Sequence, residues 1–204
     1  DHTIWADQID GLHGFRRIAP DLRGMGRSDA PDLGYGIGIY AVDLAALLDA
    51  FGVDDVVLCG FSMGGYVAFE FLRRWRHRVR ALVLVSTRAE ADTAEGRRGR
   101  DAAAALARES GAGAIADSML PKMLTPATIN GSPDLVERTR AIMAATPVAG
   151  IAGALSAMRD RPDSMELLEG LEGIPALVVV GEEDQLTPPD RARAMAEAIP
   201  GARL

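Results

Sequence analysis

The chain has 204 residues, of which 48% are hydrophobic and 25% charged, a composition typical of one globular domain with a sizeable core. The formal net charge of −7 argues against nucleic acid or an anionic membrane as the main partner. Cys59 is the single cysteine, so an intrachain disulfide and a cysteine-based metal site are excluded. Its place inside an apolar run predicts a small buried side chain. The histidines His2, His13 and His77 show no metal-ligand spacing, so we expect no metal.

No segment approaches the length of a membrane span, so we expect no membrane-embedded part. The sequence shows no signal peptide, which favours the cytoplasm. The start at Asp1, without a methionine, indicates that the true N-terminus is absent.

A helix is predicted to end at Gly52, after an extended segment over residues 15–19 and a turn-rich loop over residues 20–29. Its apolar face consists of four residues spaced i, i+3, i+4 and i+7, namely Leu44, Leu47, Leu48 and Phe51. Glycine is common just after a helix because it adopts left-handed backbone conformations, which is why we end the helix there.

Two apolar runs, residues 55–59 and 79–85, are predicted to be strands, with a helix over residues 63–74 between them. Their hydrophobicity is continuous rather than alternating. Continuous apolar strands are typical of a parallel sheet between helix layers, so we expect both faces of the sheet to be covered.

From about residue 91 to residue 169 no strand-like run occurs and alanine dominates. Two pairs, Ser132-Pro133 and Thr146-Pro147, predict helix starts in which the hydroxyl caps the helix and the proline takes its first position. We therefore predict a helical cap inserted into the core over residues 91–169.

The sheet is predicted to resume over residues 174–180. Thr187 and Asp190 are expected to form a capping box that opens a helix running to Ile199, and a further strand should start near Leu204. The predicted fold class is α/β, with a mostly parallel sheet flanked by helices. One domain is built from a first core part (1–90), the cap (91–169) and a second core part (170–204).

Ser62 stands between Gly60 and Gly64, directly after a predicted strand and before a predicted helix. A nucleophile on such a turn has a strained backbone, so we expect the residues two positions on either side to need minimal side chains. The helix that begins at Met63 would aim its free N–H groups and its positive dipole end at a developing oxyanion. The alternative is a glycine-rich turn that joins a strand to a helix and has no chemical role.

A serine hydroxyl needs a base, usually a histidine that a carboxylate orients. Asp184 is the candidate carboxylate because it lies just beyond the end of a predicted strand, where sites in open α/β sheets gather. Its neighbours Glu182 and Glu183 leave open the alternative of three solvated acids in a loop.

These residues resemble the α/β-hydrolase fold family, in its group of small serine esterases, lactonases and haloperoxidase-like members. Four segments carry the resemblance: residues 21–28, 60–65, 80–84, and 181–184 with Pro188. The resemblance implies that Ser62 is the nucleophile, Asp184 the triad acid and the Met63 N–H half of the oxyanion hole, with no cofactor. It also implies a small carboxylic ester or lactone as substrate, and the chain looks most similar to 3-oxoadipate enol-lactonases. Serine at position 62 argues against the dehalogenases and epoxide hydrolases of this fold, which use aspartate.

Two features of the family pattern do not occur in the chain. Members carry their triad histidine after the acid, but His2, His13 and His77 all precede Asp184, and we expect none of them to be the base. The family's early His-Gly motif, which supplies a second oxyanion donor, would lie before Asp1. We therefore expect a fragment truncated at both ends and nearly inactive by itself. A perhydrolase or cofactor-free haloperoxidase, and a non-catalytic ligand-binding or interaction protein, are the alternatives.

Overall fold

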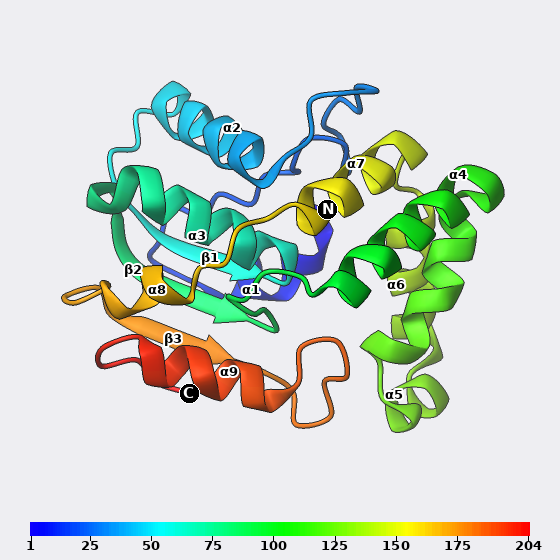
Figure 1. Ribbon diagram of the computed structural model, residues 1–204. Coiled ribbons are helices and arrows are strands. Elements are labelled where there is room, and N and C mark those ends of the chain that lie inside the picture. The colour runs from blue at the N-terminus through cyan, green and yellow to red at the C-terminus, as the bar shows by residue number, and fades with distance from the viewer.

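A computed structural model describes residues 1–204 (Figure 1). Three parallel strands form one sheet in the order β1 (Val56–Phe61), β2 (Val79–Val85) and β3 (Ala176–Val179). Phe61 pairs with Val85 and Val85 pairs with Val179, so the carboxyl ends of all three strands meet at one edge. The predicted parallel sheet is confirmed, and this edge is where the predicted site residues lie.

The rest of the chain is mainly helical (Figure 1). The α-helices are α1 (Ala6–Gly11), α2 (Ile37–Ala50), α3 (Met63–Trp75), α4 (Ala94–Met123), α5 (Pro126–Gly131), α6 (Pro133–Ala144), α7 (Val148–Arg159), α8 (Met165–Glu169) and α9 (Pro189–Ala198). Two short 3₁₀ turns, η1 (His2–Trp5) and η2 (Arg76–Arg78), complete the set. No strand occurs between β2 and β3, where only helices were predicted.

The main core lies between one face of the sheet and helices α2, α3 and α9. Leu82 and Leu84 of β2 and Val178 of β3 face it and are almost completely buried. A second apolar cluster joins α4 to α7, and it consists of Ala104, Ala107, Ala112, Ile115, Ile151, Ala152 and Leu155. The helical segment between β2 and β3 thus has a small core of its own.

Within residues 1–204 the opposite face of the sheet is largely open, so helices of these residues cover only one of the two faces predicted to be covered. Val57, Leu177 and Val179 point to this face and are 54%, 40% and 42% exposed, and Cys59 is exposed with them. Near the carboxyl edge Trp5 packs edge-on against Phe61, with ring centroids 6.3 Å apart. A continuous apolar run shows that both faces of a strand can be buried. Burial of both faces also requires that a helix lie on each of them.

The helix predicted to end at Gly52 is α2, and Gly52 does adopt a positive φ of 61°. Its buried face differs from the predicted one and consists of Ile37, Tyr40, Ala41, Ala45 and Leu48, whereas Phe51 is 46% exposed. The predicted face contained the larger apolar residues. The actual face includes two alanines, because small side chains allow close packing of α2 on α3.

The two predicted hydroxyl caps did not form. Pro133 does begin α6, but the Ser132 side chain makes no capping hydrogen bond. The Thr146 hydroxyl donates instead to the carbonyl of Ile142 in the preceding helix. Two other threonines do cap helices, Thr93 for α4 and Thr125 for α5.

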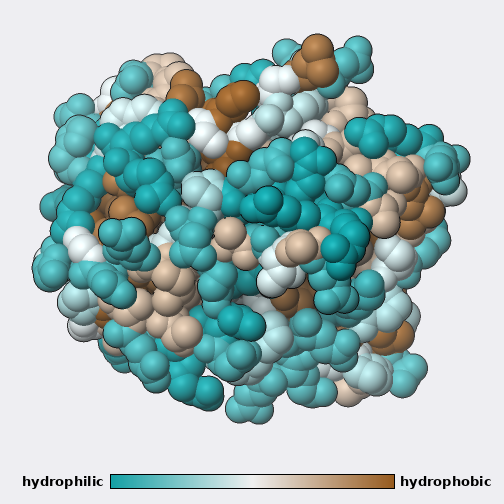
Figure 2. All heavy atoms as spheres, in the orientation of Figure 1, coloured by the Kyte–Doolittle hydropathy of each residue, from teal (hydrophilic) through white to brown (hydrophobic).

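At the end of the chain, where a further strand was expected to start, Arg203 forms an isolated parallel bridge with Leu177. The face of the molecule shown in Figure 2 is mostly hydrophilic, with apolar residues in small separate patches. No single helix meets the length and hydropathy of a membrane span. The pair α6 and α7, bent by 89°, does so together by length and composition alone.

Candidate active site

The backbone at Ser62 is strained. β1 ends at Phe61 and α3 begins at Met63, and the residue between them has φ 51° and ψ −114°. A non-glycine residue in such a conformation costs about 1–3 kcal/mol and persists only where its surroundings hold it. The Ser62 N–H donates to the Val85 carbonyl at 3.0 Å. The half-buried Ser62 is therefore fixed at the carboxyl edge of the sheet.

The glycines around Ser62 differ in what they permit. A Cβ on Gly60 would lie 2.6 Å from the Gly64 carbonyl oxygen, so this position excludes any side chain. A Cβ on Gly64 would meet nothing within 4 Å, so the prediction that Gly64 must lack a side chain was wrong. The tight position on the helix side is Gly65, where a Cβ would lie 2.6 Å from Cγ2 of Thr87. The spacing in the sequence does not reveal this, since Thr87 comes from the turn after β2.

Met63 is the first residue of α3, which extends over 13 residues. The first N–H groups of a helix have no partner within the helix, and they carry the positive end of its dipole. The Met63 N–H therefore belongs to this positive helix end and directly follows Ser62 in the chain. An oxygen that gains negative charge next to Ser62 would be stabilised there.

Asp184 lies in the loop after β3 and is half-buried, whereas Glu182 and Glu183 are exposed. Its Oδ1 accepts the N–H groups of Leu186 and Thr187 at 2.9 and 2.8 Å. Its Oδ2 accepts the Thr187 hydroxyl at 2.8 Å. These bonds fix the orientation of one acid among the three in this loop.

The prediction that Thr187 and Asp190 form a capping box was wrong, because Asp184 binds the Thr187 side chain. The Thr187 hydroxyl is engaged by Asp184, and α9 begins at Pro189 without a side-chain cap. A proline at the first position needs no N–H partner, so the helix can start without a capping side chain.

Ser62 and Asp184 lie at the same edge of the sheet but do not touch. β2 separates β1 from β3, and adjacent strands are about 4.8 Å apart, which places the two strand ends about 10 Å apart. No hydrogen bond joins the two residues.

None of the three histidines is hydrogen-bonded to Ser62 or Asp184. His2 Nδ1 lies 2.9 and 3.0 Å from the two carboxylate oxygens of Asp21. His13 is exposed in a turn, and His77 lies in η2, two residues beyond the end of α3. Because a 13-residue helix is about 20 Å long, His77 lies far from Ser62 at its other end.

The loop over residues 21–28, expected to support the site, is organised around Asp21. The Asp21 carboxylate accepts the Arg27 N–H at 2.9 Å, and its carbonyl accepts the Ser28 hydroxyl at 2.7 Å. The loop also contacts α7, because a Cβ on Gly150 would lie 2.7 Å from the carbonyl carbon of Gly24. This glycine contact joins the loop to the helical segment between β2 and β3.

A buried charged cluster, the Asp92 cluster, consists of Asp92, Arg88, Arg100 and Arg161. Asp92 is fully buried. Its carboxylate lies 2.6 Å from the guanidinium group of Arg88, 3.0 Å from that of Arg100 and 2.9 Å from that of Arg161. Burial opposes its ionisation, but the hydrogen bond and charge of Arg100, with those of Arg161, hold the pKa of Asp92 below its ordinary value. Arg88 follows β2 and Arg161 follows α7, so the cluster joins both ends of this helical segment to the core.

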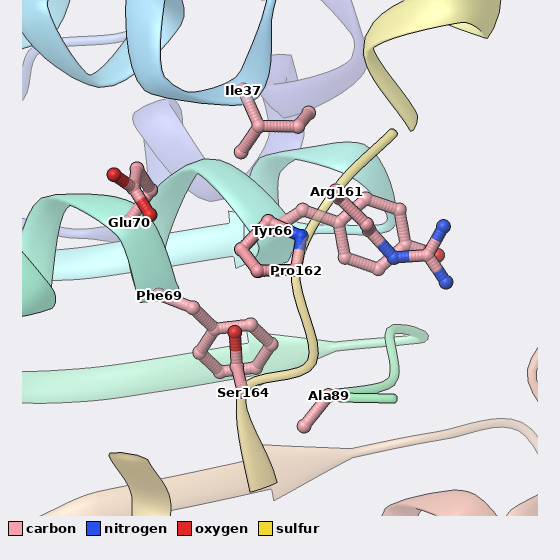
Figure 3. A pocket seen from close by; sticks show the side chains of 8 residues that line it. All are labelled: Ile37, Tyr66, Phe69, Glu70, Ala89, Arg161, Pro162 and Ser164. Carbon is pink, nitrogen blue, oxygen red and sulfur yellow. The ribbon is translucent and has the colours of Figure 1, made fainter. Parts of the chain in front are cut away.

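Two pockets lie away from the predicted site residues. The smaller, shown in Figure 3, is bounded by Tyr66 and Phe69 of α3, Ile37 of α2 and the segment 161–164. Its volume of about 10 Å³ suits a water molecule and not a substrate. A wider groove runs along α2 and residues 18–31. Ser62, Met63 and Asp184 line neither of them.

The sequence model of the family described as alpha/beta hydrolase fold matches residues 1–204. The chain belongs to this family. It is therefore a hydrolase of the α/β-hydrolase fold, which confirms the resemblance predicted from the four sequence segments.

Relatives of this hydrolase include esterases and enol-lactonases. A thermophilic esterase from Thermogutta terrifontis is 40% identical and superposes with a TM-score of 0.96 over 100% of this chain and 75% of the esterase. The enol-lactonase from Burkholderia xenovorans LB400 is 31% identical, with a TM-score of 0.90 over 100% of this chain and 76% of that enzyme. The 3-oxoadipate enol-lactonase 2 of Acinetobacter baylyi is 29% identical over 91% of this chain and 68% of its own length.

Proposed function

We propose that this protein is a serine hydrolase that cleaves a small carboxylic ester or a lactone. The observation that carries the proposal is the strained conformation of Ser62 at the junction of β1 and α3, beside the free N–H of Met63. A structural turn has no need of a strained serine, whereas a nucleophile must project its hydroxyl from the edge of the sheet. The similarity to a named esterase and to two named enol-lactonases supports the substrate class.

In the proposed mechanism the Ser62 Oγ attacks the carbonyl carbon of the substrate while a histidine accepts its proton. The Met63 N–H stabilises the oxyanion of the tetrahedral intermediate. The histidine then protonates the leaving oxygen, and water hydrolyses the acyl-enzyme. Asp184 orients the histidine, which fits a carboxylate fixed by Thr187 and Leu186. We assign the histidine role to none of His2, His13 and His77.

We also propose that residues 91–169 form a cap domain, with residues 1–90 and 170–204 as the core. The separate apolar cluster between α4 and α7 supports this division. The Asp92 cluster lies where the two ends of the proposed cap meet the core.

The decisive test is labelling of the natural full-length protein with a fluorophosphonate probe, followed by mapping of the modified peptide. We expect modification at Ser62, no labelling of Ser62→Ala, and a loss of about 10⁶-fold in ester hydrolysis by that variant. Gly64→Ala is the matched control, because its added Cβ meets no atom. If the probe does not label Ser62 in the folded protein, the protein would instead be a non-catalytic binding protein. Faster acyl transfer to peroxide than to water would identify a perhydrolase.

A further inference from the structure

The peptide group between Ser62 and Met63 joins the two proposed functional groups of the turn. Its carbonyl belongs to Ser62, the proposed nucleophile, and its N–H belongs to Met63, the proposed oxyanion donor. A trans peptide is planar, with its C=O and N–H on opposite sides. Any group that holds the Ser62 carbonyl therefore also sets the direction of the Met63 N–H.

Two donors hold this carbonyl. One is the Gly65 N–H within α3, with an N···O distance of 2.9 Å. The other is the hydroxyl of Thr87, whose Oγ1 lies 2.8 Å from the Ser62 oxygen. Thr87 is 2% exposed, so water does not compete for its hydroxyl and the bond acts in a low-dielectric environment.

The backbone that carries Thr87 is itself fixed. Ser86 has a φ of 42°, so the chain turns sharply after β2. The Ser86 N–H donates to the Val179 carbonyl on β3 at 2.8 Å. The Thr87 methyl group fills the space beside Gly65, where a Cβ would lie only 2.6 Å away. The turn after β2 thus holds the Thr87 hydroxyl in one fixed position next to the Ser62 carbonyl.

We propose that Thr87 is a positioning residue for hydrolysis at Ser62 and acts through the Ser62–Met63 peptide group. The inference rests on the function proposed above. Without the hydroxyl, only Gly65 holds the carbonyl and the peptide group can rotate. The Met63 N–H then stabilises the oxyanion less well in the transition state, while binding of the uncharged ester is unchanged. The rate constant kcat falls and KM stays constant.

The test compares Thr87→Val, which lacks the hydroxyl, with Thr87→Ser, which keeps it, in the natural full-length protein hydrolysing p-nitrophenyl butyrate. We expect Thr87→Val to lower kcat by about 10- to 100-fold, less than the 10²- to 10³-fold loss of a complete oxyanion donor, with KM within about twofold. Thr87→Ser should stay within about threefold of the wild-type kcat. Thr139→Val is the control, because the half-buried Thr139 hydroxyl also bonds to a backbone carbonyl, that of Leu135 at 2.7 Å.

A Thr87→Val variant with wild-type kcat, or a Thr87→Ser variant that loses as much activity as Thr87→Val, would overturn the proposal. If Thr87→Val does not fold, the folded fractions of Thr87→Ala and Thr87→Ser are compared by their rates of fluorophosphonate labelling. The same outcomes then overturn the proposal, with Thr87→Ala in place of Thr87→Val. Ser62→Ala separates the two proposals. If it keeps its activity, the proposed function fails; if it is inactive while Thr87→Val is unaffected, only the role of Thr87 fails.

Discussion

Replacing Gly65 by alanine tests whether the contact between α3 and the turn after β2 is as close as the structure indicates. The added Cβ would lie 2.6 Å from Cγ2 and 2.7 Å from Cβ of Thr87. Thr87 is buried and its Cβ is fixed to the backbone, so the clash cannot be relieved by a side-chain rotation alone. Overpacking of this kind costs about 1–3 kcal/mol. For a chain of 204 residues, this lowers the Tm by roughly 2–10 °C.

The neighbouring change Gly64→Ala is the matched control, because it makes the same substitution in the same helical turn and meets no atom within 4 Å. Alanine is the better helix former by up to about 1 kcal/mol, so we expect Gly64→Ala to be neutral or stabilising. The assay is thermal and urea-induced unfolding of the wild type and both variants, followed by circular dichroism at pH 7. In the double variant Gly65→Ala with Thr87→Ala, the cost of the Gly65 change should shrink, because the two sites are coupled.

Equal stability of the Gly65→Ala and Gly64→Ala variants would refute this reasoning. It would mean that the turn after β2 moves away from α3 without cost. Loss of stability in both variants would show instead that the start of α3 does not tolerate alanine for a reason other than Thr87.

Two further predictions concern the helical segment between β2 and β3. Gly150→Ala should destabilise the protein by about 1–3 kcal/mol in urea unfolding, because its Cβ would lie 2.7 Å from the Gly24 carbonyl carbon. Gly99→Ala, at an exposed helical position with nothing within 4 Å, should instead stabilise it. The lowered pKa of Asp92 predicts stability that is present above pH 4 and lost as the pH falls through the folded-state pKa. Asp92→Asn should lower the unfolding free energy at pH 7 by about 3–5 kcal/mol and weaken this acid dependence, which urea titrations from pH 7 to pH 3 would measure.

The sequence was sufficient for the parts of this protein that depend on local pattern. The apolar runs located all three strands, and helical spacing with Gly52 located α2 and its end. Motif spacing identified the family and the position of Ser62 between a strand and a helix. These features follow from preferences of neighbouring residues, which a sequence displays directly.

The tertiary structure decided whatever depends on residues that are distant in the sequence. The importance of Gly65 rather than Gly64 follows from Thr87, which lies 22 positions beyond Gly65 and reaches α3 only because β1 and β2 pair. The exposure of Cys59 likewise depends on which helices lie on each face of the sheet. Thr187 was predicted to cap a helix, but a nearby carboxylate competes for its hydroxyl. The sequence therefore determined that a strained serine turn exists, and the packing of neighbouring strands decided which residues hold it in place.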